Sequence, residues 1–209
     1  MITLYTWTTP NGRKISIALE EMALDYECVA IDITRDEQFA PAFLQISPNN
    51  RIPAIVDGDR SIFESGAILL YLAANTGRFM PDYDSPAYWE MMQWLMWQMS
   101  GFGPTLGQAH HFLHYNPGKS AYAETRYHDQ ALQLYRVLDR RLAESEFLLD
   151  TLTIADFAVW PWASRFDYQN IDLRGFPHVT RWYLQLAARP AFQRGYARPL
   201  DVGPIPQPG

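Results

Sequence analysis

The first third of the chain alternates between strand-like and helix-like patterns of apolar residues. Ile2–Trp7 is predicted to be a strand, and a turn-forming cluster, Thr9–Gly12, follows it. Apolar residues then recur at helical spacing, which predicts an amphipathic helix over Arg13–Ala23. A second strand is expected at Cys28–Asp32 and a short helix at Ala40–Gln45.

A hairpin and one more helix complete this series. Ala54–Val56 and Ser61–Phe63 are short apolar runs, and the Asp57-Gly58 step between them favours a tight turn. A helix is expected to begin near Ser65 and to run through Leu72. The predicted order is β-α-β-α-β-β-α, in which strands that flank a helix pair in parallel and the hairpin adds an antiparallel edge. This order predicts an α/β fold.

After Gly77 and Pro81 the pattern becomes helical throughout. Pro86 suits the first turn of a helix. Tyr88–Met99 is apolar and aromatic on nearly all sides, which predicts a helix that is buried on several faces. The glycines of Gly101–Gly107 are expected to break that helix.

Three further helices are predicted in this part of the chain. Tyr127–Leu142 carries the apolar spacing of a long amphipathic helix. Thr153–Asp156 resembles a capping box, with Asp in place of the usual Glu or Gln, and opens the strongly apolar segment Ile154–Ser164. We expect that helix to be central. Another helix is expected from Pro177 to Arg189 and to stop before Pro190.

These patterns divide the chain into two domains and a tail. The α/β domain is expected over residues 1–80 and an all-helical domain over residues 86–200. The boundary is expected near residues 76–85, in a linker that contains Gly, Pro and Asp. Residues 201–209 are rich in Pro and Gly and are expected to form a flexible tail.

Composition and charge remove several classes of function. The net charge is −6, and no basic run or basic helix face stands out, so we expect no nucleic acid partner. Apolar runs such as Ala67–Ala74 are too short to span a bilayer, so no membrane partner is expected. The first residues lack the pattern of a signal peptide, and the single cysteine fits a reducing compartment. We therefore expect a cytoplasmic location.

That cysteine, Cys28, falls within a predicted strand, where a thiol commonly behaves as a small apolar side chain. We interpret it as structural. Redox chemistry in this protein would then need a thiol from another molecule.

A first candidate site lies in Ser47–Val56, where Pro53 directly precedes a predicted strand. Proline is tolerated there because its position needs no ladder hydrogen bond. A cis Ile52–Pro53 bond would turn the preceding backbone outward. The N–H and C=O of Ile52 could then pair with an extended peptide, as in strand addition.

A second candidate site lies at Glu64 and Ser65, where a strand ends and a helix begins. Ser65 can cap the helix, and the N–H groups at its start can hold an anion. Glu64 can hold an ammonium group. A carboxylate and an α-amine bound side by side are the head of a γ-glutamyl group. The alternative is that Ser65 is only a cap and Glu64 only a surface charge.

A third feature is a group of three histidines. His110 and His114 share a helical face, as metal ligands can, but no nearby carboxylate or cysteine completes a ligand set. We therefore expect no metal. Packing or the lining of a substrate cleft is the preferred interpretation, and it also applies to a few neighbouring apolar side chains. The residues concerned are His110, His111, His114, Trp94, Trp97 and Met99.

At these motifs the chain resembles the glutathione transferase superfamily. The pattern N-x-x-P-A-I-V-D followed by F-E-S-G-A-I-x-x-Y-L is specific when it comes after a β-α-β opening, and the capping box is a second landmark of that family. The resemblance extends over about residues 1–195. Thr9–Gly12, Ile46–Val56 and Gly107–Phe112 are similar to the nu-class branch, which includes bacterial glutathione-dependent disulfide-bond reductases.

The resemblance implies a thioredoxin-like N-terminal domain, a helical C-terminal domain that lines the second-substrate cleft, and a homodimer. It implies that glutathione is the co-substrate. Ile52 should pair with the cysteinyl backbone, with Pro53 cis, and Arg126 should reach glutathione in the neighbouring subunit. The implied glutathione-binding residues are Gln38, Arg51, Ile52, Pro53, Glu64, Ser65 and Arg126.

The chain differs from many transferase classes in the residues expected next to the glutathione sulfur. Those classes place a Tyr, Ser or Cys after the first strand, whereas Tyr5 lies inside the strand here and is interpreted as structural. The nu-class resemblance instead assigns catalysis to Thr9 and Asn11, at the start of the first helix. A thiol has a pKa of ~8.5, and a helix N-terminus with a hydroxyl or amide donor can lower it by one or two units.

The leading hypothesis is a glutathione-dependent disulfide-bond reductase with glutathione transferase activity. A second glutathione in the cleft would let the enzyme cycle between two thiols and a disulfide without Cys28. One alternative is conjugation or lysis of an aromatic ether or halide, which the aromatic-rich second domain suggests. The other is a non-catalytic module that only binds glutathione. The sequence does not indicate the physiological second substrate.

Overall fold

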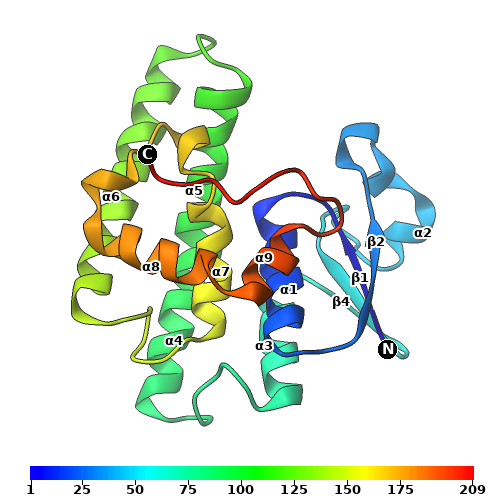
Figure 1. The fold of residues 1–209 in the computed structure, drawn as a ribbon. Coiled ribbons are helices and arrows are strands. Elements are labelled where there is room, and N and C mark those ends of the chain that lie inside the picture. The colour runs from blue at the N-terminus through cyan, green and yellow to red at the C-terminus, as the bar shows by residue number, and fades with distance from the viewer. The chain divides into compact units, whose positions relative to one another are not determined.

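The computed structural model describes all 209 residues (Figure 1). The chain forms two compact units. The N-terminal unit contains Met1–Met80 and Ala187–Ile205, and the helical unit contains Pro81–Leu186 and Pro206–Gly209. The division after residue 80 falls within the expected linker. Residues 187–205 group with the N-terminal unit, whereas the sequence pattern assigned residues 187–200 to the helical domain.

A four-stranded mixed sheet organises the N-terminal unit. The strands are β1 (Ile2–Thr6), β2 (Tyr26–Ala30), β3 (Ala54–Asp57) and β4 (Arg60–Phe63), in the order β2-β1-β3-β4. β1 pairs in parallel with β2 and antiparallel with β3, and β3 pairs antiparallel with β4. The predicted hairpin is confirmed, and the chain turns at Gly58, where φ is 61°.

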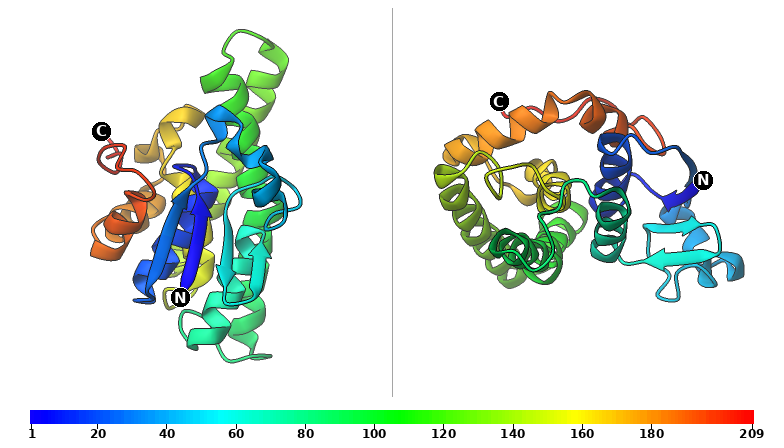
Figure 2. Two further views of the ribbon diagram at one scale, coloured as in Figure 1. Left: turned by 90° about the vertical axis from the view of Figure 1, so that its right-hand side faces the viewer. Right: turned by 90° about the horizontal axis from the view of Figure 1, so that it is seen from below.

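Helices cover both faces of this sheet. Alternate residues of β1 point to opposite faces, and Leu4 is buried on the face where α1 and α3 lie side by side (Figure 2). Tyr5 points to the other face, where its ring lies 6.1 Å from that of Phe43 in α2. This is the thioredoxin-like arrangement expected from the resemblance. Its helices are α1 (Pro10–Glu21), η1 (Ile33–Arg35), η2 (Glu37–Phe39), α2 (Pro41–Leu44), α3 (Ser65–Thr76) and α9 (Pro190–Tyr196).

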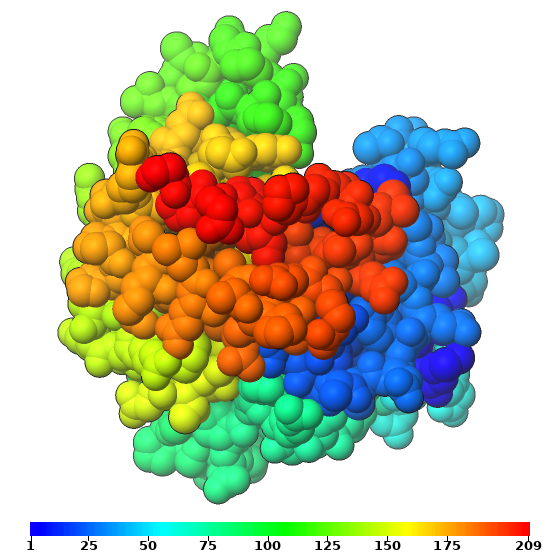
Figure 3. All heavy atoms as spheres, viewed as in Figure 1, coloured from blue at the N-terminus to red at the C-terminus, as the bar shows by residue number.

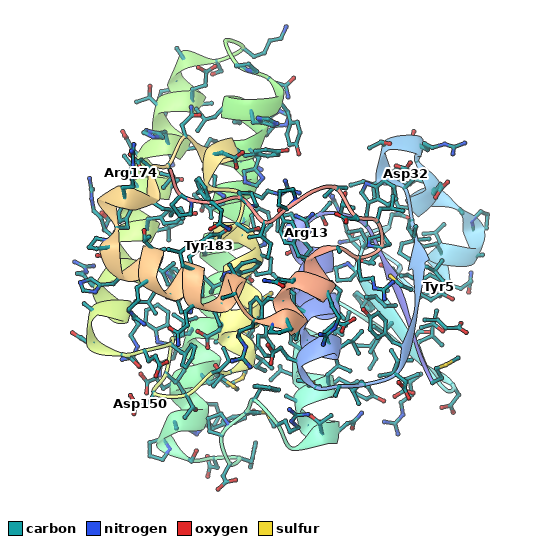
Figure 4. All side chains as sticks on the ribbon, in the orientation of Figure 1. Tyr5, Arg13, Asp32, Asp150, Arg174 and Tyr183 are labelled. Atoms are coloured by element: carbon teal, nitrogen blue, oxygen red, sulfur yellow. The ribbon has the colours of Figure 1, made fainter.

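Helix α9 was not predicted, because Pro190 was interpreted only as the end of the preceding helix. Pro190 instead occupies the first turn of α9, where a missing N–H costs nothing. α9 packs on α1, and Figure 3 shows the orange-red residues of α9 against the blue residues of α1. The Arg13 guanidinium lies 3.5 Å from the centre of the Tyr196 ring (Figure 4), and a Cβ on Gly195 would meet the Ile17 backbone at 2.6 Å.

The helical unit is built around α7. Its helices are α4 (Pro86–Trp97), the π-helix η3 (Gln98–Phe102), α5 (Gly103–Ala109), the π-helix η4 (His110–Tyr115), α6 (Ala121–Glu144), α7 (Ile154–Ala163), η5 (Phe166–Gln169), η6 (Leu173–Gly175) and α8 (Pro177–Ala187). Every residue of α7 is buried, so the prediction that this helix is central is confirmed.

The predicted capping box at the start of α7 is also confirmed. The Thr153 hydroxyl accepts a hydrogen bond from the Ala155 N–H at 3.3 Å, and the Asp156 carboxylate accepts one from the Thr153 N–H at 3.0 Å. In this way the N–H groups of Thr153 and Ala155, which have no backbone acceptor within the helix, are both hydrogen-bonded.

Two expectations for the helical unit were wrong. α4 buries only Met91 and Leu95, while Trp89 and Met96 are 50% and 44% exposed, so this apolar helix presents one face outward. The glycine-rich segment Gly101–Gly107 does not break the helical path. The chain widens into a π-helix and continues as α5, because Gly103 allows close approach to Gln98 and Trp162.

Residues 201–209 carry no helix or strand. The Tyr183 hydroxyl of α8, labelled in Figure 4, donates a hydrogen bond to the Pro206 carbonyl at 2.7 Å within the helical unit. No helix in the structure combines the length and the apolar character needed to cross a bilayer.

Candidate active site

Strand register brings the N-terminal motifs to one end of the sheet. Tyr5 of β1 pairs with Ala54 of β3, and Ala54 pairs with Phe63 of β4. The turn after β1, the loop before β3 and the start of α3 after β4 therefore meet at the same sheet end. The segment that follows β2 begins at that end as well, because β2 runs parallel to β1.

The turn after β1 supplies the start of α1. Thr9 is the N-cap of α1, and its hydroxyl oxygen accepts the Gly12 N–H at 3.5 Å while its own proton remains able to donate. A Cβ on Gly12 would lie 2.2 Å from the Thr6 hydroxyl and 2.4 Å from the Trp7 carbonyl, so only glycine fits this turn. The helix end that carries Thr9 and Asn11 is thus held tightly against β1.

The loop before β3 presents the backbone of Ile52. The Ile52–Pro53 peptide bond is cis, as the resemblance implied. Neither the N–H nor the C=O of Ile52 has a backbone partner within the chain. The loop is anchored by Ser47, whose hydroxyl donates to the Arg51 carbonyl at 2.8 Å. This geometry leaves room for an extended peptide to pair with Ile52.

Two buried side-chain oxygen acceptors without a partner lie in the segments that follow β2 and precede β3. The Oε1 atom of Gln38, in η2, and the Oδ1 atom of Asn50 are buried and accept no hydrogen bond. A buried acceptor that lacks a donor costs about 1–3 kcal/mol. Such atoms fit a bound ligand that brings its own N–H groups, as a peptide does. The residues present therefore suit a tripeptide such as glutathione.

Glu64 and Ser65 stand at the junction of β4 and α3. Glu64 has φ 70° and ψ 117°, a conformation that side chains other than glycine rarely adopt and that is common at ligand-binding positions. The expectation that Ser65 caps α3 was wrong. Glu64 occupies the cap without a side-chain capping bond, and Ser65 is the first residue of the helix. The Ser65 hydroxyl instead accepts a hydrogen bond from the Lys14 ammonium at 3.3 Å.

Tyr5 contributes to a separate feature. Its ring lines an apolar pocket of about 340 Å³ between β1 and the η2–α2 segment, with Phe43 among its neighbours. It lies on the face of β1 opposite Leu4 and Thr6, in keeping with a packing role. The other residues that line this pocket are Ile31, Glu37, Ala40, Ala42 and Ile46.

The histidines belong to the helical unit. His110 is buried, stacks on Trp162 at 5.4 Å between ring centres, and its Nε2 atom lies 3.0 Å from the amide nitrogen of Gln169. Burial, and then the positive charge of Arg165, lower the pKa of His110 to about 3. His114 stacks on Tyr168 at 3.6 Å. These contacts are aromatic packing, and no group of three His, Cys, Asp or Glu side chains is placed to hold a metal ion.

Arg126 lies on α6 of the helical unit and is exposed. The other predicted site residues all lie in the N-terminal unit. They are Thr9, Asn11, Gln38, Arg51, Ile52, Pro53, Glu64 and Ser65. Sequence reasoning missed two residues there, Lys14 and Asn50. Lys14 stands four positions before the apolar Ala18, on the inner face of α1, which is a signal that was available. Asn50 is the Asn of the N-x-x-P pattern, three positions before Pro53, and that local signal distinguishes it from Asn49.

Comparison with known proteins agrees with this geometry. Residues 1–74 match the family model of the glutathione S-transferase N-terminal domain, and residues 121–184 match that of the C-terminal domain. The disulfide-bond oxidoreductase YfcG of Escherichia coli (strain K12) is 47% identical over 199 residues, which cover 91% of this chain and 92% of YfcG.

Two solved structures show the same likeness. A glutathione transferase from Pseudomonas putida, described with one glutathione disulfide per subunit, has a TM-score of 0.89 and 38% identity, covering 95% of this chain and 91% of that one. A glutathione transferase from Burkholderia graminis, described with two glutathione molecules per subunit, has a TM-score of 0.88 and 37% identity, covering 95% and 88%. The sheet-end geometry, both domain models and these relatives together show that the chain belongs to the glutathione S-transferase family.

Proposed function

We propose that this protein binds glutathione at the sheet end of its N-terminal unit and uses it to reduce disulfide bonds. The observation that carries the proposal is the meeting of Thr9, Ile52 and Glu64 at one end of the sheet, each on a different connecting segment. The 47% identity to a disulfide-bond oxidoreductase over nearly the whole chain supports the same chemistry.

In this proposal each residue has one role. Glu64 and Ser65 hold the γ-glutamyl head, Ile52 pairs with the cysteinyl backbone, and Gln38 and Arg51 make further contacts. Thr9 and Asn11 then hold the sulfur at the start of α1. A helix N-terminus and a hydroxyl donor each favour the thiolate over the thiol, and each unit by which the thiol pKa falls corresponds to ~1.4 kcal/mol.

The reaction needs two molecules of glutathione. The first thiolate attacks one sulfur of the disulfide, forms a mixed disulfide and releases the other sulfur as a thiolate that takes up a proton. The second glutathione, as a thiolate, attacks the glutathione sulfur of the mixed disulfide. The products are glutathione disulfide and two substrate thiols, so electrons and protons balance without a protein cysteine.

Cys28 is a poor candidate for a step in this reaction. It lies within β2, paired with Leu4, and burial raises the pKa of its thiol. A thiol with a raised pKa supplies less thiolate at neutral pH. The relatives described with two glutathiones or one glutathione disulfide per subunit suit a cycle that uses glutathione alone.

The test is a substrate panel with Cys28→Ala and Glu64→Gln variants. We expect glutathione-dependent reduction of a small disulfide by the wild type and by Cys28→Ala at similar rates, and a raised KM for glutathione in Glu64→Gln. A folded Cys28→Ala variant without reductase activity would refute the proposal. Turnover of aromatic halides or ethers but not of disulfides would favour conjugation, and glutathione binding without any turnover would favour a non-catalytic module.

We also propose a homodimer, in which Arg126 reaches the partner's glutathione. The outward face of α4 supports it, since Trp89 and Met96 are 50% and 44% exposed one above the other on that helix. Analytical ultracentrifugation should give twice the mass of one chain, and Met96→Glu should shift it toward the monomer. A wild type that sediments as a monomer would contradict this. A cytoplasmic location stays a prediction.

A further inference from the structure

Lys14 is a buried ammonium group beneath the proposed glutathione site. It lies on α1 and is 1% exposed, although lysine is among the residue types least often buried. Its Nζ atom donates a hydrogen bond to the Ser65 hydroxyl at 3.3 Å, which ties α1 to the first residue of α3. The charge therefore lies next to the helix start that is proposed to hold a carboxylate.

Burying this charge has a cost. Burial lowers the pKa of Lys14 well below its usual range, and the negative charge of Glu64 partly opposes that shift. A methionine of similar length would fill the same space without the desolvation cost. A lysine at this position therefore has an advantage over an apolar side chain only if its charge or its hydrogen bond has a role of its own.

Two opposite charges consequently border the start of α3. Glu64 is exposed and held in its unusual backbone conformation, and Lys14 lies beneath Ser65. The head of a γ-glutamyl group is a zwitterion with an α-ammonium and an α-carboxylate. Ser65 therefore has one anionic and one cationic residue beside it, and such a head carries one charge of each sign.

We propose that Lys14 is a positioning residue that forms the cationic half of a zwitterion site, with Glu64 as the anionic half. It orients Ser65 and adds a positive charge to the α3 N-terminus, so that this position selects an α-amino acid head rather than a simple amine or acid. The inference rests on the proposed function, because it assumes that the γ-glutamyl head lies at Ser65.

The expected size of the effect follows from the hydrogen bond to Ser65. A carboxylate bonded to Ser65 lies two hydrogen bonds from Lys14, about 6 Å away. At an effective dielectric constant near 20 this attraction corresponds to about 100-fold in affinity, which desolvation reduces. We therefore expect Lys14 to contribute about tenfold, or about 1.4 kcal/mol, to glutathione affinity.

The test compares three ligands by calorimetric Kd: glutathione, γ-aminobutyryl-Cys-Gly, which lacks the α-carboxylate, and glutaryl-Cys-Gly, which lacks the α-amine. The wild type should bind both analogues about tenfold more weakly or worse. Lys14→Met should lose the preference over the first analogue and keep the preference over the second. Glu64→Gln, the matched control, should show the reverse pattern.

This experiment tests the role of Lys14 separately from the proposed placement of glutathione. If Lys14→Met keeps the full wild-type preference for the α-carboxylate, the role of Lys14 is refuted while the proposed site stands. If the wild type binds the decarboxylated analogue as tightly as glutathione, the γ-glutamyl head is not held at Ser65, and the proposed placement of glutathione is refuted. Far-UV circular dichroism shows whether each variant is folded.

A measurement on a native Lys14 keeps the inference testable if Lys14→Met does not fold. The chain contains only two lysines, Lys14 and the exposed Lys119. In a Lys119→Arg variant labelled with ¹⁵N-lysine, the single Nζ signal belongs to Lys14. Glutathione should shift that signal and the decarboxylated analogue should leave it nearly unchanged. Equal shifts with both ligands, or none with either, would refute the role of Lys14.

Discussion

Replacing Asp156 by Asn should destabilise the helical unit severely. The Asp156 carboxylate is fully buried at the start of α7 and accepts four hydrogen bonds. One oxygen accepts from the Leu148 N–H at 2.9 Å and the Trp182 indole N–H at 3.0 Å. The other accepts from the Thr153 N–H at 3.0 Å and the Thr153 hydroxyl at 3.3 Å.

An asparagine keeps one of these oxygens and replaces the other with an NH₂ group. In either orientation the NH₂ group faces two donors, and at least one of them is a backbone N–H. Each buried donor left without an acceptor costs about 1–3 kcal/mol, so we expect a loss of about 4 kcal/mol. For a chain of this length that loss lowers Tm by about 8–16 °C.

The assay is urea unfolding followed by circular dichroism, with Asp139→Asn as the matched control. Asp139 of α6 accepts the N–H groups of His178 and Val179, at 2.9 and 3.0 Å, through one oxygen. An asparagine can serve both, so the control should cost at most about 1 kcal/mol. The reasoning is refuted if Asp156→Asn is as stable as Asp139→Asn.

Three further predictions follow from single positions. Glu64→Gly should raise the free energy of unfolding by about 1 kcal/mol, because glycine adopts φ 70° without strain, yet it should weaken glutathione binding; equal or lower stability in urea unfolding would contradict this. Gly12→Ala should raise the KM for glutathione more than tenfold, because its Cβ would meet the Thr6 hydroxyl at 2.2 Å and displace the turn; unchanged kinetics would count against the site. The pKa of His110 is about 3 in the folded protein against 6.5 when unperturbed, so its neutral form stabilises the fold above pH 6.5 and that contribution is lost as pH falls. Between pH 7 and pH 5, the free energy of unfolding of the wild type should fall by about 2 kcal/mol more than that of His110→Gln, as measured by denaturant titration. An equal pH dependence of both proteins would contradict the lowered pKa of His110.

Local signals made much of the fold predictable. The Asp57-Gly58 turn, the capping box at Thr153 and the proline at position 86 each act within a few residues, and each has the structure that its pattern indicates. The motif at Pro53 was predictable through the family resemblance alone, because a cis peptide bond has no signature in a single sequence.

Features that depend on distant contacts were not predictable in the same way. The pairing of α9 with α1 depends on the close approach of Gly195 to Ile17, 178 positions away by residue number. Trp89 and Met96 are exposed although their helix, α4, is apolar on nearly all sides. An apolar pattern shows that a helix is hydrophobic, but it does not show which of its faces a neighbouring element covers. The helical pattern of α1 places Lys14 on the inner face, but it does not contain the partner of Lys14, the Ser65 hydroxyl 51 positions away.

The most direct test of the central claim is a crystal structure of the protein soaked with glutathione. We expect a tripeptide at the sheet end, with its γ-glutamyl head at Glu64 and Ser65, its cysteinyl backbone paired with Ile52, and its sulfur nearest Thr9 and Asn11. A glutathione bound elsewhere, or one at this site whose sulfur lies nearest to Cys28, would contradict the account.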